Sequence, residues 1–150
     1  MIFDIYTEND FDELKDMVFG LYSEDPEGMP MTESKIKKTA NESLHRPEKV
    51  RIIIIRSGGA IIGYGMLTFS WSNEYGGDIV NIDELFIKDG YRNRKAASAF
   101  IRHTMETYKN AVIFELETTP SNENALKLYK KMGFEVAANT HMQYIAGGRL

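Results

Sequence analysis

The spacing of hydrophobic residues changes along the chain, and this spacing predicts strands and helices in alternation. Residues 2–6 predict a short strand, and Asp10 is placed to cap a following helix. Two prolines and a glycine within residues 23–32 predict a loop, after which residues 34–45 predict a second amphipathic helix. The apolar face of the first helix, spaced by three and four residues, comprises Phe11, Leu14, Met17, Val18 and Leu21.

Runs of β-branched and aromatic residues in the middle of the chain predict consecutive strands. Residues 50–55 and 61–69 are joined by Ser57-Gly58-Gly59-Ala60, which is typical of a hairpin. A second break at residues 73–77 precedes a strand over 79–87, so the three strands are expected to form a meander. The remaining pattern predicts a helix over 94–108, a strand over 112–116, a helix beginning at Asn122, and strands near 134–137 and 141–145.

This order of elements predicts one mixed sheet with helices on both faces. A chain of 150 residues, 43% of them hydrophobic, is long enough to bury one core and short for two. No internal repeat or linker is visible. We therefore expect a single domain over residues 1–150.

Composition excludes several kinds of chemistry. The chain has no cysteine, so a disulfide scaffold, a thiolate metal site and a cysteine nucleophile are all excluded. His45, His103 and His141 show no ligand spacing, so no metal site is predicted. The longest aliphatic run, residues 52–55, is far shorter than the roughly 18 residues that a membrane span needs. We expect a cytoplasmic protein without a membrane partner.

The formal net charge of −4 bears on the partners of the protein. Nucleic acid is disfavoured, because a basic face is needed to replace phosphate counterions. Cationic small molecules are more plausible, although mild acidity is also ordinary for a soluble domain.

The segment from Asn122 to Phe134 combines a helix cap, a helical stripe, a tyrosine and a glycine stop. It resembles the closing motif of the GNAT superfamily of N-acetyltransferases, Asn-x-x-Ala-x-x-Leu-Tyr-x-x-x-Gly-Phe. The resemblance implies that Tyr129 faces the sulfur of acetyl-CoA and stabilises the departing thiolate, and that Asn122 contacts the pantetheine arm. Propensity alone instead favours a core position for Tyr129, on the stripe that it shares with Ala125, Leu128 and Met132.

A basic segment between the strand over 79–87 and the next helix predicts an anion site. Cations are disfavoured at a helix N-terminus, by about 0.3–1 kcal/mol each, and an anionic ligand relieves this misplacement. Asn93 tolerates a left-handed backbone, and small side chains let a diphosphate approach. A solvated basic turn is the alternative. The predicted binding residues are Arg92, Asn93, Arg94, Lys95, Ala96 and Ala97.

This segment is similar to the GNAT pyrophosphate loop, Arg/Gln-x-x-Gly-x-Gly/Ala, with Arg92 first and Ala97 last. Lys95 stands at the central glycine, and Asp89 replaces the proline common before the loop. The lysine side chain either points outward, leaving its N–H free, or obstructs the diphosphate.

The resemblance also implies the fold and the position of the acetyl arm. The expected architecture is a GNAT-like acyl-CoA N-acyltransferase fold, α+β, with a mostly antiparallel sheet splayed between its fourth and fifth strands. The arm lies in this gap against the main chain of Leu85, Phe86 and Ile87, where an N–H group can stabilise the thioester oxyanion.

Asp83 and Glu84 are the nearest acidic candidates for removing a proton from an attacking amine. As neighbours in a regular strand they leave on opposite faces, Asp83 with Asn81, Leu85 and Ile87, and Glu84 with Ile82 and Phe86. Only one can face the acceptor unless a bulge intervenes. Either acid is also compatible with a surface position or a local hydrogen bond.

We therefore expect an acetyl-CoA-dependent N-acetyltransferase that acts by direct transfer to a small primary amine, with Tyr129, Asp83 and Glu84 as catalytic residues. No metal and no covalent enzyme intermediate are expected, and a homodimer is left open. A non-catalytic acyl-CoA-binding or regulatory module, suggested by Lys95, is one alternative. A peptide or protein N-acetyltransferase is another.

Overall fold

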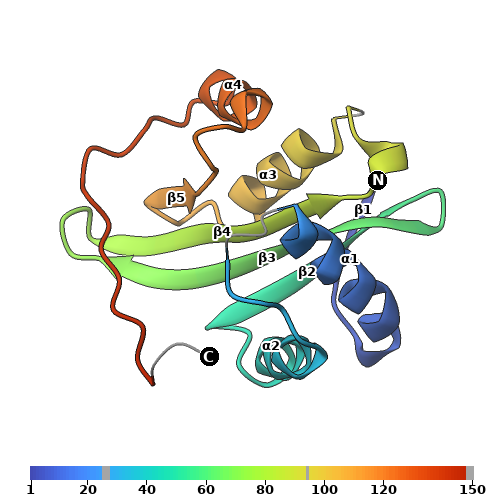
Figure 1. Cartoon of the computed structure of the whole chain (residues 1–150). Helices are drawn as coiled ribbons and strands as arrows, with labels where there is room; N and C mark the ends of the chain where they lie inside the picture. The colour runs from blue at the N-terminus through green and yellow to red at the C-terminus, as the bar shows by residue number, and fades with distance from the viewer. Residues whose placement is uncertain (25–27, 94, 148–150) are drawn as a thin grey trace. The chain divides into compact units, whose positions relative to one another are not determined.

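Five strands in the order β1-β2-β3-β4-β5 form the sheet of this computed structural model, which describes residues 1–24, 28–93 and 95–147 (Figure 1). The chain forms two compact units, Met1–Glu117 and Thr118–Leu150. The first contains β1 (Ile2–Ile5), α1 (Phe11–Ser23), α2 (Glu33–His45), β2 (Val50–Ser57), β3 (Ala60–Ser72), β4 (Gly77–Ile87), α3 (Ala96–Thr107) and β5 (Ile113–Leu116), and the second contains α4 (Glu123–Lys131).

Helices cover both faces of the sheet, with α1 and α2 on one face and α3 on the other (Figure 1). Alternate residues of each strand point to opposite faces, so Ile52, Tyr64 and Met66 join the core beneath α1 and α2. Gly65, between the last two, faces Phe100 of α3. The predicted mixed sheet with helices on both faces is confirmed, as is the meander of β2, β3 and β4.

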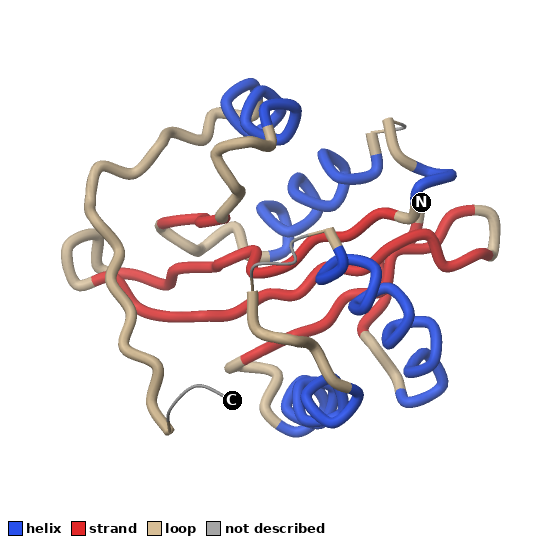
Figure 2. Tube along the Cα trace, viewed as in Figure 1, coloured by secondary structure: helices blue, strands red, loops and turns tan. Residues whose placement is uncertain are grey.

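An extra residue interrupts the ladder between β3 and β4. Met66 pairs with Glu84 and Leu67 pairs with Ile82, so Asp83 is left over as a β-bulge. Beyond this point β4 also loses its other neighbour, because β5 runs parallel to β4 only along Ile79–Ile82. Figure 2 shows β5 as a short strand beside part of the much longer β4.

The predicted strands near residues 134–137 and 141–145 are not formed. Described residues after α4 are irregular, and Val136, Met142 and Tyr144 are 75%, 86% and 94% exposed. A β-strand is stabilised by a hydrogen-bonded neighbour, and alternation of apolar residues does not supply one. The pattern alone therefore overpredicted strand here.

Asp10 precedes α1 as predicted, but its carboxylate does not cap that helix. It accepts hydrogen bonds from the Thr7 N–H at 3.1 Å and from Arg56 at 2.7 Å. The Arg56 hydrogen bond and charge help to hold the pKa of Asp10 below its usual value, against the effect of burial.

None of the helices in the described part of the chain combines the length and the apolar character that a membrane span requires.

The close packing of β3 against α3 predicts the effect of adding one methyl group. A Cβ atom at Gly65 would overlap the ring of Phe100, which is completely buried. We expect Gly65→Ala to lower the free energy of unfolding by about 1–3 kcal/mol, measured by urea denaturation. Gly90→Ala is the control, since the space around Gly90 is open, and should change stability by less than about 0.5 kcal/mol. Equal stability of the two variants would contradict this packing.

Candidate active site

A cavity of about 260 Å³ opens between the α1–α2 layer and the sheet. Most of its wall is apolar, with polar groups contributed mainly by β3, β4 and the end of α1. Its lining residues are Leu14, Val18, Tyr22, Met31, Ile36, Thr39, Ile52, Tyr64, Met66, Asp83 and Glu84. An apolar chamber with a few convergent polar groups is the usual form of a small-molecule site.

The β-bulge brings both predicted acids to this cavity. In a regular strand, consecutive residues point to opposite faces, but the extra residue lets Asp83 and Glu84 line the same chamber. The predicted opposite-face arrangement is therefore wrong for this pair. Asp83 shares its side with Asn81, as predicted, but Glu84 lies on that side too.

Glu84 is held by two tyrosines from different elements. Its Oε2 atom accepts a hydrogen bond from Tyr22 at 2.5 Å, and its Oε1 atom accepts one from Tyr64 at 2.6 Å. Burial raises the pKa of Glu84, although the two hydrogen bonds oppose this effect. Burial, reinforced by Glu84, raises the pKa of both phenols, so they remain neutral donors at pH 7.

Asp83 is the more open of the two acids. Its side chain is exposed and receives a weak hydrogen bond of 3.4 Å from the Asn81 amide, which also donates to Thr68. Partial burial, followed by repulsion from Glu117, raises the pKa of Asp83. The site thus contains one exposed acid beside one that is fixed by hydrogen bonds.

The main chain of β4 beyond the bulge has a free edge. The Lys88 N–H donates to Ile62 on β3, and by antiparallel alternation the main chain of Phe86 faces β3 as well. The N–H groups of Leu85 and Ile87 then point to the edge that β5 does not cover. Arg92 Nε uses this edge, donating to the Ile87 carbonyl at 2.7 Å. Of the three predicted contact residues, Leu85 and Ile87 present main-chain groups there.

The guanidinium of Arg92 is occupied by groups of the same chain. Besides the Ile87 carbonyl, it contacts Glu24 at 2.6 Å and Asp89 at 2.8 Å, and it lies 5.4 Å from the centre of the Phe86 ring. Arg92 thereby ties the end of β4 to the loop that follows it.

Two residues just before α3 have a left-handed backbone conformation. Asn93 and Lys95 have φ values of 62° and 65°, the only non-glycine residues in the described chain with positive φ. Lys95 is the N-cap and makes no side-chain capping hydrogen bond. The first N–H groups of α3, from Ala96 and Ala97, have no intrahelical acceptor and are available to an anion. Arg94 lies outside the described residues.

The second unit has the local geometry that its sequence predicts. Asn122 caps α4 by accepting a hydrogen bond from the Ala125 N–H at 3.2 Å, and Gly133 ends the helix region with a φ of 97°. Tyr129 and Phe134 pack edge to face at 6.2 Å between ring centres. Burial raises the pKa of the Tyr129 phenol, which stays protonated at neutral pH.

Tyr22 and Tyr64 are site residues that sequence reasoning missed. Tyr22 follows Val18 by four residues on the helical stripe, and Tyr64 lies between two glycines in a β-run, so both matched ordinary core positions. Their convergence on Glu84 depends on the pairing of β3 with β4 and on the packing of α1. The nearest sequence signal was one tyrosine on the apolar face of each element.

The fold is shared with acetyltransferases of known structure, and the sequence matches a family model. The model of the acetyltransferase (GNAT) family matches residues 12–134. No curated protein matches the sequence. A probable acetyltransferase of known structure has 21% identity and a TM-score of 0.82, covering 99% of this chain and all of its own. A possible acetyltransferase from Clostridium difficile 630 has 18% identity and a TM-score of 0.81, covering 97% of each chain.

A third solved structure was obtained with a bound nucleotide. It is an aminoglycoside N-acetyltransferase in complex with CoA, with 17% identity and a TM-score of 0.77 over 97% of this chain and 94% of that one. At such identities the structural likeness establishes the fold, and the family match establishes the kinship. The chain belongs to the GNAT family of acetyltransferases.

Proposed function

We propose that this protein transfers the acetyl group of acetyl-CoA to a primary amine of a small molecule by direct attack. The observation that carries the proposal is the bulge at Asp83, which gives one cavity two carboxylates beside the free edge of β4. A cationic amine is attracted by such a pair and must lose a proton before it can attack.

The residues of the first unit suit a diphosphate and an extended acyl arm. The uncapped N–H groups of Ala96 and Ala97 would hold the diphosphate, and the Leu85 and Ile87 N–H groups would pair with the arm. Acetyl-CoA supplies the activated acetyl group. The Arg92 guanidinium already contacts Glu24, Asp89 and the Ile87 carbonyl. In this proposal, backbone N–H groups therefore provide most of the contacts to the anion.

Three side chains are given roles in the proposed reaction. An alkylammonium has a pKa of about 10, so Asp83 draws the cation in and Glu84 accepts its proton, directly or through one water. The amine nitrogen then forms a bond to the acetyl carbon, and the tetrahedral oxyanion that results collapses with cleavage of the carbon–sulfur bond. The second proton of the nitrogen passes to water as the amide forms, and Glu84 returns the first proton to solvent. Tyr129 donates a hydrogen bond or its proton to the sulfur, and the main-chain N–H of Leu85 or Ile87 stabilises the oxyanion.

The cavity favours a slim acceptor. An engineered cavity of about 150 Å³ holds benzene, so the 260 Å³ present here accommodates roughly ten non-hydrogen atoms. Its aliphatic wall suits an alkyl or arylalkyl amine, with the amino group at the acids. An aminoglycoside exceeds this volume, so the neighbour's acceptor is not carried over to this protein.

A binding titration and a turnover panel test the proposal together. Acetyl-CoA binding is measured by calorimetry, and thiol release is followed with alkylamines, diamines, amino acids, aminoglycosides and peptides. We expect binding, with the highest kcat/KM for small alkyl or arylalkyl amines. Binding without turnover would support a non-catalytic module instead, and turnover with peptides alone would support a peptide acetyltransferase.

Glu84→Gln tests the base. Because burial raises the pKa of Glu84 above its ordinary value of 4.5, kcat/KM for the wild type should fall as the pH drops through this raised value and Glu84 becomes protonated. The variant should lose about 10²-fold in kcat/KM at neutral pH and should lack this acidic limb. Glu106→Gln, at an exposed position of α3, is the control. An unchanged acidic limb in Glu84→Gln would remove Glu84 from the proton transfer.

Tyr129→Phe tests the acid. Removing the hydroxyl while keeping the ring should lower kcat by about 10²-fold and leave acetyl-CoA affinity nearly unchanged. Calorimetry and steady-state turnover provide the two readouts. Tyr144→Phe serves as the control, since Tyr144 is 94% exposed. Full turnover by Tyr129→Phe would assign the tyrosine to packing alone.

Lys95→Gly tests the departure from the family loop. Lys95 adopts a left-handed backbone that costs a non-glycine residue about 1–2 kcal/mol, partly offset by the larger chain entropy of unfolded glycine. We expect a gain of about 0.5–1 kcal/mol in unfolding free energy, with acetyl-CoA binding at least as tight as that of the wild type. Lys95→Ala removes the same charge but keeps the Cβ atom. An equal gain in Lys95→Ala would assign the effect to charge rather than to backbone strain.

A further inference from the structure

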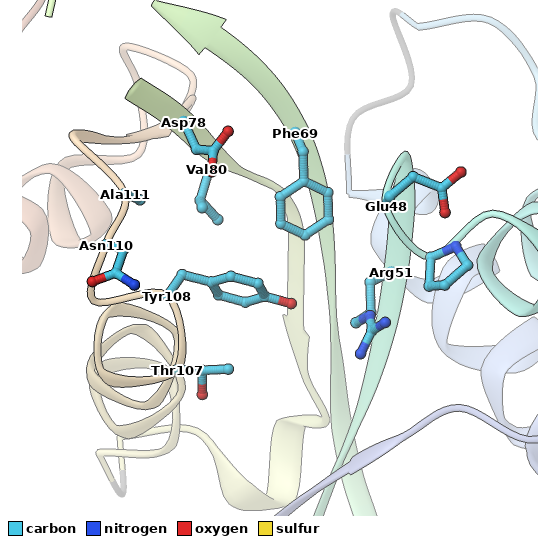
Figure 3. Close-up of a pocket in the computed structure, with 10 residues that line it drawn as sticks. Glu48, Arg51, Phe69, Asp78, Val80, Thr107, Tyr108, Asn110 and Ala111 are labelled. Carbon is cyan, nitrogen blue, oxygen red and sulfur yellow. The ribbon is translucent and has the colours of Figure 1, made fainter. Parts of the chain in front are cut away.

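A second and larger cavity, of about 640 Å³, lies on the opposite face of the sheet (Figure 3). Arg51 lines this cavity, whereas the next residue, Ile52, lines the cavity of the two acids, so the two chambers are separated by the sheet itself. All its described walls belong to the first unit. They are Pro47, Glu48, Arg51, Phe69, Asp78, Val80, Thr107, Tyr108, Asn110 and Ala111.

Arg51 is the polar feature of this cavity that most needs a partner. Its Nε atom is buried without a hydrogen-bond acceptor among the described residues, and none of the ion pairs found there involves Arg51. A buried donor without an acceptor costs about 1–3 kcal/mol, more when it is charged. A planar guanidinium pairs best with a carboxylate, through two parallel hydrogen bonds.

Aromatic rings form the apolar part of the same cavity. The rings of Phe69 and Tyr108 lie 5.2 Å apart, centre to centre, at an angle of 52°. Figure 3 shows the Tyr108 ring extending across the cavity, with its hydroxyl toward the side of Arg51. The volume lies within the range of about 300–1,000 Å³ that is usual for ligand pockets. A flat apolar group therefore has a surface to pack on next to the guanidinium.

Two acids limit the charge that the cavity accepts. Glu48 and Asp78 line it with exposed side chains, and Figure 3 shows Asp78 across the pocket from Arg51. A multiply charged anion such as phosphate would be repelled by both acids. A single carboxylate directed at Arg51 would be tolerated, and an amino group on the same molecule could face Asp78.

We propose that this cavity is a binding site for a small monocarboxylate with a flat apolar body, anchored by Arg51 and packed against the paired rings of Phe69 and Tyr108. The site is separate from that of acetyl transfer and does not depend on the proposed function. Its ligand class follows from a guanidinium that forms none of the ion pairs found among the described residues and whose Nε lacks an acceptor there, together with two rings and two acids.

Phenylacetate is the probe for a titration of the full-length protein, followed by amide chemical shifts in NMR spectra. We expect saturable shifts confined to the beginning of β2, the part of β3 around Phe69, the beginning of β4 and the end of α3. Arg51→Met keeps most of the apolar stem and should weaken binding by about tenfold or more, the loss expected for a charged hydrogen-bonding partner. Arg46→Met removes a surface arginine outside the cavity and should bind as the wild type does.

Further ligands and one further variant make the test decisive. Phenethylamine and inorganic phosphate should bind at least tenfold more weakly than phenylacetate. Arg51→Lys, which keeps the charge but not the planar fork, should bind with intermediate affinity and covers the case in which Arg51→Met does not fold. The proposal is overturned if phenylacetate causes no shifts up to about 10 mM, if Arg51→Met and Arg51→Lys both bind it as the wild type does, or if phosphate binds as tightly.

Discussion

One extra residue in β4 determines how the candidate active site is built. Without the bulge at Asp83, the strand would send one carboxylate into the α3 side of the sheet, where the core is apolar. With it, both carboxylates line the cavity beneath α1 and α2. The bulge also coincides with the point where β5 stops pairing, which leaves the Leu85 and Ile87 main chain open. The two acids and the free strand edge therefore lie together at a single irregularity of β4.

Keeping Glu84 at this position requires help from outside β4. A carboxylate in a largely apolar chamber is costly unless hydrogen bonds replace its lost hydration. Tyr64 on the neighbouring strand and Tyr22 near the end of α1 provide these bonds, one to each oxygen. Because Tyr22 belongs to a helix, the packing of α1 fixes the acid as firmly as the sheet does. The result is a carboxylate with a raised pKa and a fixed orientation, both of which suit a base at neutral pH.

Sequence patterns predicted the regular elements well and the tertiary relations poorly. Periodicity located β2, β3, β4 and the helices, because each of these elements buries one face and the spacing of apolar residues within the element reveals that face. The bulge could not be found in this way, because it is defined by the pairing of Asp83 and Glu84 against Met66 and Leu67. For the same reason, Tyr22 and Tyr64 looked like ordinary core residues. The unformed C-terminal strands show the converse, as alternation near Val136 came without a pairing partner.

The loop before α3 shows how a family motif can keep its geometry while changing its residues. The motif places glycine where Lys95 now stands, and the backbone there still has the left-handed conformation that glycine adopts most easily. Arg92, the first motif residue, uses its guanidinium to fasten the loop to Ile87, Asp89 and Glu24. Arg92 thus fixes the main chain before α3, and Lys95 adopts the left-handed turn that leads into the helix. In the proposed function, an anion at this helix start would be recognised mainly by N–H groups, and the side chains would set the direction of these groups without touching the ligand.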